Sequence, residues 1–155
     1  MSATPPPADL PKAVLFACNM NAVRSPMAEA ILRYLAGRQI YVESAGVRAG
    51  GEADPFAVAV MDEIGIDISK HTPQAIADLH DSSFDLVVSL SPEAHHQALE
   101  MTRTQAIDAE YWPTLDPTAA MGSREQILDA YRAVRNSLFD RIKKRFPLSG
   151  GLARV

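Results

Sequence analysis

Short apolar runs alternate with longer stretches in which apolar residues recur every three to four positions. Residues 13–17 form a continuous apolar run, which is typical of a strand buried on both faces of a parallel sheet. Three later segments also have strand character, at residues 40–44, 84–90 and 105–110. The periodic stretches between them predict helices. This alternation predicts an α/β fold, with a parallel sheet and helices on both of its faces.

Start and stop signals bound the predicted helices. The first runs from Ser25 to Ala36, with Ser25 as the N-cap, Pro26 at the first helical position and Gly37 as the C-terminal cap. Its apolar stripe consists of Met27, Ile31 and Leu35, with Ala28 and Leu32 beside them. The other helices are predicted to open at Asp54-Pro55, Thr72-Pro73, Ser91-Pro92 and Ser123, and the last ends at Phe146.

Length and composition limit the domain organisation and the function classes. The chain has 155 residues, enough for one ordinary domain with a full core. The first twelve residues carry four prolines, so we expect a flexible tail over residues 1–12 and a single domain over residues 13–155. The net charge of −4 and the lack of a long basic run argue against nucleic-acid binding. No apolar run is long enough to span a bilayer, so no membrane contact is expected.

The cysteine and histidine content narrows the chemistry further. Cys18 is the single cysteine, so no internal disulfide can form, and a lone thiol suits a reducing compartment. No secretory signal is recognisable in the first residues, and we therefore expect a cytoplasmic location. The adjacent His95 and His96 point in different directions on a predicted helix, so we expect them to be solvent-exposed. No metal site is predicted.

The segment from Cys18 to Ser25 carries the candidate chemistry. It connects the first predicted strand to the first predicted helix, where ligands bind in folds of this kind. Backbone N–H groups in such a loop can converge on one anion, and the helix dipole adds positive charge there. Arg24 follows Cys18 by six residues, and its guanidinium fork matches two oxygens of a phosphate. The predicted oxyanion-binding residues are Asn19, Met20, Asn21, Ala22, Val23, Arg24 and Ser25.

The same surroundings make Cys18 a candidate nucleophile. A thiol at a helix N-terminus beside an arginine is expected to ionise near neutral pH and to attack as the thiolate. The Ser25 hydroxyl can hydrogen-bond the sulfur and help it to leave in a later step. The plain alternative is a buried structural thiol and an unrelated surface arginine. A Cys–Arg pair at this spacing is common by chance, but its combination with a preceding apolar strand and a following Ser-Pro helix start is much rarer.

These residues resemble the low-molecular-weight protein tyrosine phosphatases and their arsenate-reductase relatives. The similarity runs from Lys12 to Phe146, with the motifs in the family's order. It rests on residues 14–18, Asn21, residues 24–29 (RSPMAE), residues 43–46 (ESAG), residues 67–71 (DISKH) and Asp116-Pro117. The resemblance implies a three-layer sandwich, in which a four-stranded parallel sheet is flanked by helices and a phosphate-binding loop follows the first strand. It implies no metal or organic cofactor.

The resemblance also implies roles for individual residues. Cys18 attacks phosphorus to form a phosphocysteine, Arg24 binds the phosphoryl oxygens, and Asp116 acts as general acid and then as general base. The loop-supporting residues are expected to be Asn21, Ser25, Ser44 and His71. A second Asp-Pro pair, Asp54-Pro55, has the features of a helix N-cap. The residues alone do not choose between the two aspartates, and the family's order favours Asp116.

Three functions remain open on the sequence. The first is cysteine-dependent hydrolysis of phosphate monoesters, with phosphotyrosine in proteins as the implied substrate. The second is arsenate reduction with an external small thiol, because the further cysteines through which thioredoxin-coupled relatives pass the oxidation are absent here. Val23 stands where the family often carries a second cysteine, so the protective disulfide of those relatives is not expected. The third is a non-catalytic module that senses oxyanions or binds a partner. Met20 permits this third function, since the family usually has a small residue there, and so does the lack of aromatic residues at 47–51 and 118–120.

The expected partners follow from these functions. They are a phosphorylated protein or a small phosphate ester, and phosphate-like oxyanions. We expect the chain to act as a monomer or a weak dimer.

Overall fold

The computed structural model describes residues 10–79 and 83–148. Four parallel strands form one sheet in the order β2-β1-β3-β4. The strands are β1 (Ala13–Cys18), β2 (Tyr41–Gly46), β3 (Leu86–Ser89) and β4 (Asp108–Tyr111). Strand β1 is central, and its Phe16 pairs with Ser44 of β2 and with Val88 of β3. The carboxyl end of β1 therefore opens between the ends of two neighbouring strands.

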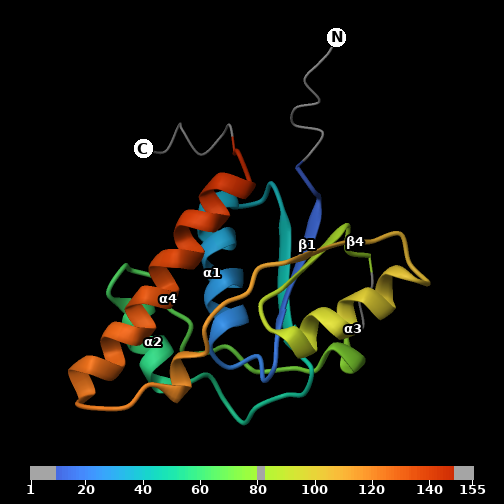
Figure 1. The fold of residues 1–155 in the computed structure, drawn as a ribbon. Coiled ribbons are helices and arrows are strands. Elements are labelled where there is room, and N and C mark those ends of the chain that lie inside the picture. Colours follow the sequence, from blue (N-terminus) through green and yellow to red (C-terminus); the bar gives the residue numbers. More distant parts are fainter. Residues whose placement is uncertain (1–9, 80–82, 149–155) are drawn as a thin grey trace.

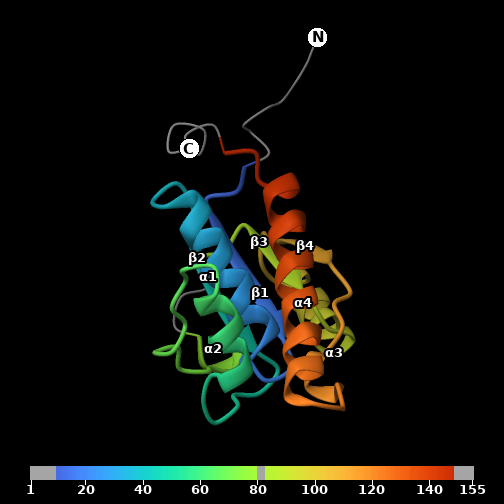
Figure 2. The ribbon, with the colours of Figure 1, turned by 90° about the vertical axis from the view of Figure 1, so that its left-hand side faces the viewer.

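Helices cover both faces of the sheet, as Figure 1 and Figure 2 show. They are α1 (Arg24–Ala36), α2 (Pro55–Asp62), α3 (Pro92–Thr102) and α4 (Arg124–Arg145), with short 3₁₀ helices η2 (Ile76–Asp78) and η3 (Pro117–Ala119). Alternate β1 residues point to opposite faces: Val14 and Phe16 pack under α1, α2 and α4, whereas Leu15 and Ala17 pack toward α3. The predicted three-layer α/β fold is therefore confirmed.

Most of the predicted helix signals work as expected. Asp54, Ser91 and Ser123 each accept hydrogen bonds from backbone N–H groups at a helix start. Gly37 ends α1 with a positive φ of 59°. The prediction for Ser25 is wrong, because α1 starts at Arg24 and Val23 precedes it without a side-chain cap. The Ser25 hydroxyl is used inside the site instead, as described below.

The helix predicted to open at Thr72-Pro73 does not exist. An α-helix is absent from residues 70–79, and only the three-residue η2 follows the proline. Gln74 is held in an extended stretch because its carbonyl accepts from Gly46 N–H at 2.8 Å and its own N–H reaches the Asn21 side chain at 2.9 Å. Ala75 forms an isolated parallel bridge with Gly46. These long-range bonds outweigh the weak local helix signal.

Most of the predicted tail falls outside the described residues. Residues 1–9 are not described. Leu10 packs against the larger core, and the Lys12 carbonyl accepts from the Tyr41 N–H at 2.8 Å. The boundary between residues 12 and 13 stays a prediction. Within residues 10–79 and 83–148, no helix is both long and apolar enough to cross a membrane.

Candidate active site

The loop from Cys18 to Arg24 lies at the carboxyl end of β1 and leads directly into α1. It forms the floor of a cavity of about 290 Å³. The cavity is lined by Cys18, Asn19, Met20, Ala22, Val23, Arg24, Arg48, Gly50, Gly51, Asp54, Asp116 and Thr118. Three segments far apart in the sequence therefore meet here: the loop itself, residues 48–54 after β2, and residues 116–118 after β4.

The loop backbone turns its carbonyl groups outward and leaves its N–H groups free. The carbonyls of Cys18, Asn19, Met20 and Ala22 accept from the N–H groups of Val47, Arg48, Gly50 and Asp54 at 2.8–3.0 Å. The backbone N–H groups of residues 19–23, by contrast, have no acceptor anywhere in the described chain. A run of unpaired N–H groups at a helix N-terminus is an anion-binding cradle.

Gly46 allows β2 to approach this loop. A Cβ atom at Gly46 would lie 2.8 Å from both the Asn19 carbonyl oxygen and the Asn21 nitrogen. Those two atoms belong to backbone and cannot swing aside. The loop is therefore pressed against the end of β2 with no room for a side chain between them.

The buried Asn21 side chain fixes the conformation of the loop through hydrogen bonds. Asn21 is fully buried and has a φ of 55°, in the left-handed region. Its Nδ2 donates to Ser25 Oγ and to Ser44 Oγ, both at 2.9 Å, while its Oδ1 accepts from the Gln74 N–H at 2.9 Å. His71 Nε2 lies 3.1 Å from both the Asn21 carbonyl oxygen and Oδ1. The four predicted loop-supporting residues thus form one hydrogen-bond network.

The candidate nucleophile is almost completely enclosed. Cys18 is 2% exposed, and its Sγ lies 3.0 Å from Ser25 Oγ. Because Ser25 Oγ already accepts from Asn21, its own hydrogen is available to the sulfur. The Ser25 hydroxyl can therefore stabilise a thiolate at Cys18.

Arg24 faces the cavity from the first turn of α1. It is 6% exposed, and its Nη1 donates to the Thr114 carbonyl at 2.9 Å. Its Nη2 lies 3.8 Å from Asp116 Oδ2. Arg24 therefore links the loop to the segment that precedes η3 and keeps Asp116 at the cavity.

The two Asp-Pro aspartates both line the cavity, but their surroundings differ. Asp54 caps α2, accepting from Phe56 N at 2.8 Å and Ala57 N at 3.3 Å, and its other oxygen accepts from the Tyr131 hydroxyl at 3.0 Å. Burial, and then the hydrogen bond to Asp54, raises the pKa of Tyr131 well above its usual range, so this hydroxyl remains a donor. Both oxygens of Asp54 are therefore occupied.

Asp116 keeps one oxygen for the cavity. Its Oδ1 accepts from Thr118 N at 3.0 Å and Thr118 Oγ1 at 2.7 Å, whereas its Oδ2 contacts only Arg24 within the described chain. The Asp116 side chain is 46% exposed, so a proton can pass between it and solvent. The geometry therefore gives Asp116 the freedom that Asp54 lacks.

Two further residues belong to the site and were missed by reasoning from the sequence. Glu29 on α1 accepts from Ser44 Oγ and lies 3.9 Å from His71 Nδ1. Gln74 donates its backbone N–H to Asn21 and its side-chain amide to the Ser44 carbonyl at 2.9 Å. Glu29 could have been suspected as an acidic residue on the sheet-facing turn of an amphipathic helix. Gln74 has no local signal, because its partners lie 30 and 53 positions away in the sequence.

The histidine pair on α3 departs in part from expectation. His96 is exposed, as predicted. His95 is only partly exposed, because its ring stacks on Tyr111 with centroids 4.6 Å apart and planes 8° apart. Tyr111 ends β4, and α3 packs over that strand, so the tertiary contact covers the histidine. In the described ranges, no three His, Cys, Asp or Glu side chains cluster in a way that could hold a metal ion.

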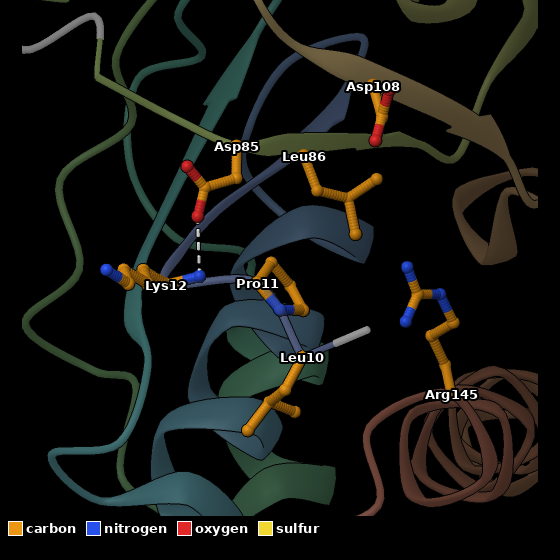
Figure 3. A pocket seen from close by; sticks show the side chains of 7 residues that line it. All are labelled: Leu10, Pro11, Lys12, Asp85, Leu86, Asp108 and Arg145. Atoms are coloured by element: carbon orange, nitrogen blue, oxygen red, sulfur yellow. Dashed lines mark hydrogen bonds between the residues drawn. The ribbon is translucent and has the colours of Figure 1, made fainter. Parts of the chain in front are cut away.

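A cavity larger than that of Cys18 lies at the amino end of the sheet, away from the loop (Figure 3). Its volume is about 640 Å³, and it is lined by Leu10, Pro11, Lys12, Asp85, Leu86, Asp108 and Arg145. Asp85 Oδ2 is bonded to the Lys12 backbone N–H at 2.5 Å, and Arg145 is paired with Glu110 at 2.8 Å. Its lining contains no cysteine and no run of free N–H groups like that of residues 19–23. Size alone therefore does not identify the site.

Comparisons with known proteins identify the relatives of this chain. A family model described as low molecular weight phosphotyrosine protein phosphatase matches residues 13–146. The chain belongs to this family. The arsenate reductase of Bacillus subtilis is 35% identical to it over 133 residues, which cover 86% of this chain and 94% of that protein.

Solved structures of the phosphatase family have the same fold. An arsenate reductase in the phosphate binding state superposes with a TM-score of 0.69 at 32% identity, covering 86% of this chain and 95% of that one. The low molecular weight protein tyrosine phosphatase of T. tengcongensis gives a TM-score of 0.69 at 28% identity, covering 85% of this chain and 95% of that one. The family thus includes proteins named for hydrolysis and proteins named for arsenate reduction.

Proposed function

We propose that this family member is a cysteine-dependent phosphatase that hydrolyses phosphate monoesters through a phosphocysteine. The observation that carries the proposal is the cradle of unpaired N–H groups at residues 19–23, which directly follows the buried Cys18 in the lining of one cavity. Arg24 and Asp116 line the same cavity. The family name suggests phosphotyrosine in proteins as the substrate.

In the first step, the Cys18 thiolate attacks phosphorus and the bond to the leaving oxygen breaks. The N–H groups of residues 19–23 and the Arg24 guanidinium hold the three non-bridging oxygens, and they bind more strongly as negative charge develops there. Asp116 donates a proton to the leaving oxygen, so the product departs as a neutral alcohol.

In the second step, water attacks the phosphocysteine. Asp116, now a carboxylate, accepts a proton from that water, and phosphate is released. The Cys18 sulfur leaves as a thiolate, which the Ser25 hydroxyl at 3.0 Å stabilises. Asp116 and Cys18 return to their starting protonation states, so the cycle needs no cofactor.

Arsenate reduction is the second candidate, and the names of the curated relatives favour it. Several relatives at 30–37% identity are named arsenate reductase, including a glutaredoxin arsenate reductase of Synechocystis sp.. On names alone, this function is better supported than phosphotyrosine hydrolysis. The cysteine content supports the phosphatase instead, because Cys18 is the only cysteine in the chain.

With one cysteine, arsenate reduction would need two external thiols. Cys18 would displace water from arsenate to form a thiolate–arsenic bond. A first external thiol would attack the Cys18 sulfur, forming a mixed disulfide and releasing arsenite with the electron pair of that bond. A second thiol would then free Cys18. The two electrons that reduce arsenic come from the two external thiols.

The deciding experiment measures hydrolysis of p-nitrophenyl phosphate and, in parallel, arsenate reduction with added glutathione. Cys18→Ser protein is the control for both reactions. Hydrolysis that disappears in this variant, without arsenate turnover, supports the phosphatase. Thiol-dependent arsenite formation without hydrolysis overturns it in favour of the reductase. Binding of phosphate or vanadate without either turnover would indicate a non-catalytic oxyanion-sensing module.

A further inference from the structure

Arg48 is the second arginine that lines the cavity of Cys18. Its side chain is exposed, whereas Arg24 is buried and bonded to Thr114. Within residues 10–79 and 83–148, no ion pair or hydrogen bond engages the Arg48 guanidinium. A cation that lines a binding cavity and has no protein partner is available to a ligand.

The backbone fixes Arg48 relative to the catalytic loop. Its N–H donates to the Asn19 carbonyl at 3.0 Å, and the flanking Val47 and Gly50 N–H groups donate to Cys18 and Met20 at 2.9 and 2.8 Å. A Cβ atom at Gly50 would lie 3.2 Å from the Met20 carbonyl, so the two segments are closely packed. The Arg48 guanidinium can change its position, but the Arg48 Cα atom stays beside the cradle.

The other charges of the cavity are already engaged. Asp54 is bonded to the start of α2 and to Tyr131, and Asp116 is bonded to Thr118 and lies 3.8 Å from Arg24. Glu52 is exposed on the same loop but does not line the cavity. Once the cradle and Arg24 hold the reacting phosphate, Arg48 carries the remaining unpaired charge. That charge favours a second anionic group.

Apart from Arg48, the walls of the cavity offer few groups that could distinguish one substrate from another. Among the described residues that line it, none is aromatic. A flat leaving group such as the tyrosine ring therefore finds no ring to stack on. The other lining residues include Met20, Gly50, Gly51 and Thr118, which carry no charge, so charge is the strongest feature by which the cavity can distinguish substrates.

We propose that Arg48 is a specificity-determining residue that binds a second anionic group of the substrate, set apart from the reacting phosphate. The inference rests on the proposed phosphatase function and names its substrate class: phosphate monoesters that carry an additional carboxylate or phosphate. That group can come from an acidic side chain beside a phosphorylated residue, or from a small acidic phosphate ester.

The test compares matched substrates that differ only in the second charge. One pair consists of phosphotyrosine peptides with flanking glutamates or with glutamines in their place. The other pair is phosphoglycerate and glycerol phosphate. The readout is the ratio of kcat/KM, acidic over neutral, for wild type, Arg48→Gln, Arg48→Lys and Arg38→Gln. Arg38 is also an exposed arginine with no partner in the described ranges, and it lies just beyond the far end of α1.

We expect wild type to prefer the acidic member of at least one pair by about three- to fivefold, as for an exposed ion pair. The preference is lost in Arg48→Gln, retained in Arg48→Lys and unchanged in Arg38→Gln, and it shrinks as salt is raised. The pair that shows the effect identifies the source of the anionic group. Equal ratios for wild type and Arg48→Gln in both pairs overturn the proposal.

A second readout separates this inference from the proposed function. If wild type hydrolyses none of these esters, the phosphatase proposal fails. Arg48 is then tested by calorimetric binding of the same substrate pairs to Cys18→Ser protein, with and without Arg48→Gln. An acidic preference in binding that vanishes with Arg48→Gln still supports the role of Arg48. No difference in binding overturns it.

Discussion

Asp54 and Asp116 show how the same dipeptide serves two purposes at the scale of single residues. Each precedes a proline, and each lines the cavity of Cys18. Asp54 has both oxygens bonded to structural donors, whereas Asp116 keeps one oxygen facing the cavity beside Arg24. A general acid must be free to lose and regain its proton, and the Asp116 oxygen that faces the cavity has that freedom.

Replacing Asp116 by alanine should therefore mainly lower kcat, whereas replacing Asp54 by alanine should mainly lower stability. Asp116→Ala is expected to lower kcat for an ester with a poor leaving group by about 10²–10⁴-fold, while phosphate still binds. Asp54→Ala is expected to cost about 1 kcal/mol of stability through the lost cap, with a much smaller effect on kcat. Steady-state kinetics and thermal unfolding of both variants check this. A larger loss of kcat in Asp54→Ala would reverse the assignment.

At the scale of elements, the candidate site depends on how closely β2, the loop from Cys18 to Arg24 and residues 47–50 pack. Three backbone hydrogen bonds join residues 18–20 to residues 47–50, and Gly46 leaves no space between β2 and the loop. The loop shape is thus set by a neighbouring strand as much as by its own sequence.

Gly46→Ala tests this packing. The added methyl group would meet backbone atoms at 2.6–2.8 Å, so the loop must shift, at a cost of about 1–3 kcal/mol. Thermal unfolding should show a lower Tm, and phosphate should bind more weakly by calorimetry. Gly51→Ala is the stability control, since an added Cβ there meets nothing within 4 Å. Equal Tm values for the two variants would contradict the packing argument.

Charged side chains join α2 to α4 away from the cavity. Glu63, which follows α2, pairs with Arg132 and Arg135 of α4, each at 2.7 Å. Arg135 is 8% exposed and also donates to the Val60 carbonyl. The hydrogen bonds from Arg132, and then those from Arg135, lower the pKa of Glu63 from 4.5 to about 2.

This pairing predicts a pH-dependent contribution to stability. Because the pKa of Glu63 is lower in the folded protein, its contribution is complete above about pH 4.5 and is lost as the pH falls toward 2. Urea unfolding should show wild type more stable than Glu63→Gln at pH 7, with the difference shrinking in acid. Asp140→Asn on α4 is the control, because that exposed carboxylate has no partner in the described ranges. A difference that does not change with pH would contradict the assignment.

At the scale of the whole molecule, the cysteine count decides how the protein responds to oxidation. Cys18 is the only thiol in 155 residues, and Val23 occupies the loop position at which the family often has a second cysteine. An oxidised Cys18 cannot be trapped as an internal disulfide. It can therefore be oxidised from sulfenic acid to sulfinic and sulfonic acid.

Peroxide should therefore inactivate the protein through Cys18, first reversibly and then irreversibly. Activity should return with an added thiol after brief exposure, at the sulfenic acid stage, and be lost for good once sulfinic acid forms. Mass spectrometry of the Cys18 peptide, together with recovery assays, follows both stages. A stable and reversible sulfenamide at Cys18 would contradict the expectation of no internal rescue.

Much of the molecule could be predicted from neighbours along the chain. The strand that begins at residue 13 and the caps at Asp54 and Ser91 each depend on a few adjacent residues, so the sequence by itself determined them, together with the place of the Cys18–Arg24 loop between strand and helix. The same holds for the α/β class, because alternating strand and helix periods lead to a parallel sheet. The resemblance to a known family added Asp116, Ser44 and His71.

Only the tertiary structure decided features whose partners are distant in sequence. Gln74 is extended because it bonds to Asn21 and Gly46, which lie far from it in the sequence. Arg48 reaches the cavity because the segment after β2 runs beside the loop. Such contacts form between residues that the fold brings together, and their free energies outweigh the local preferences on which a sequence pattern depends.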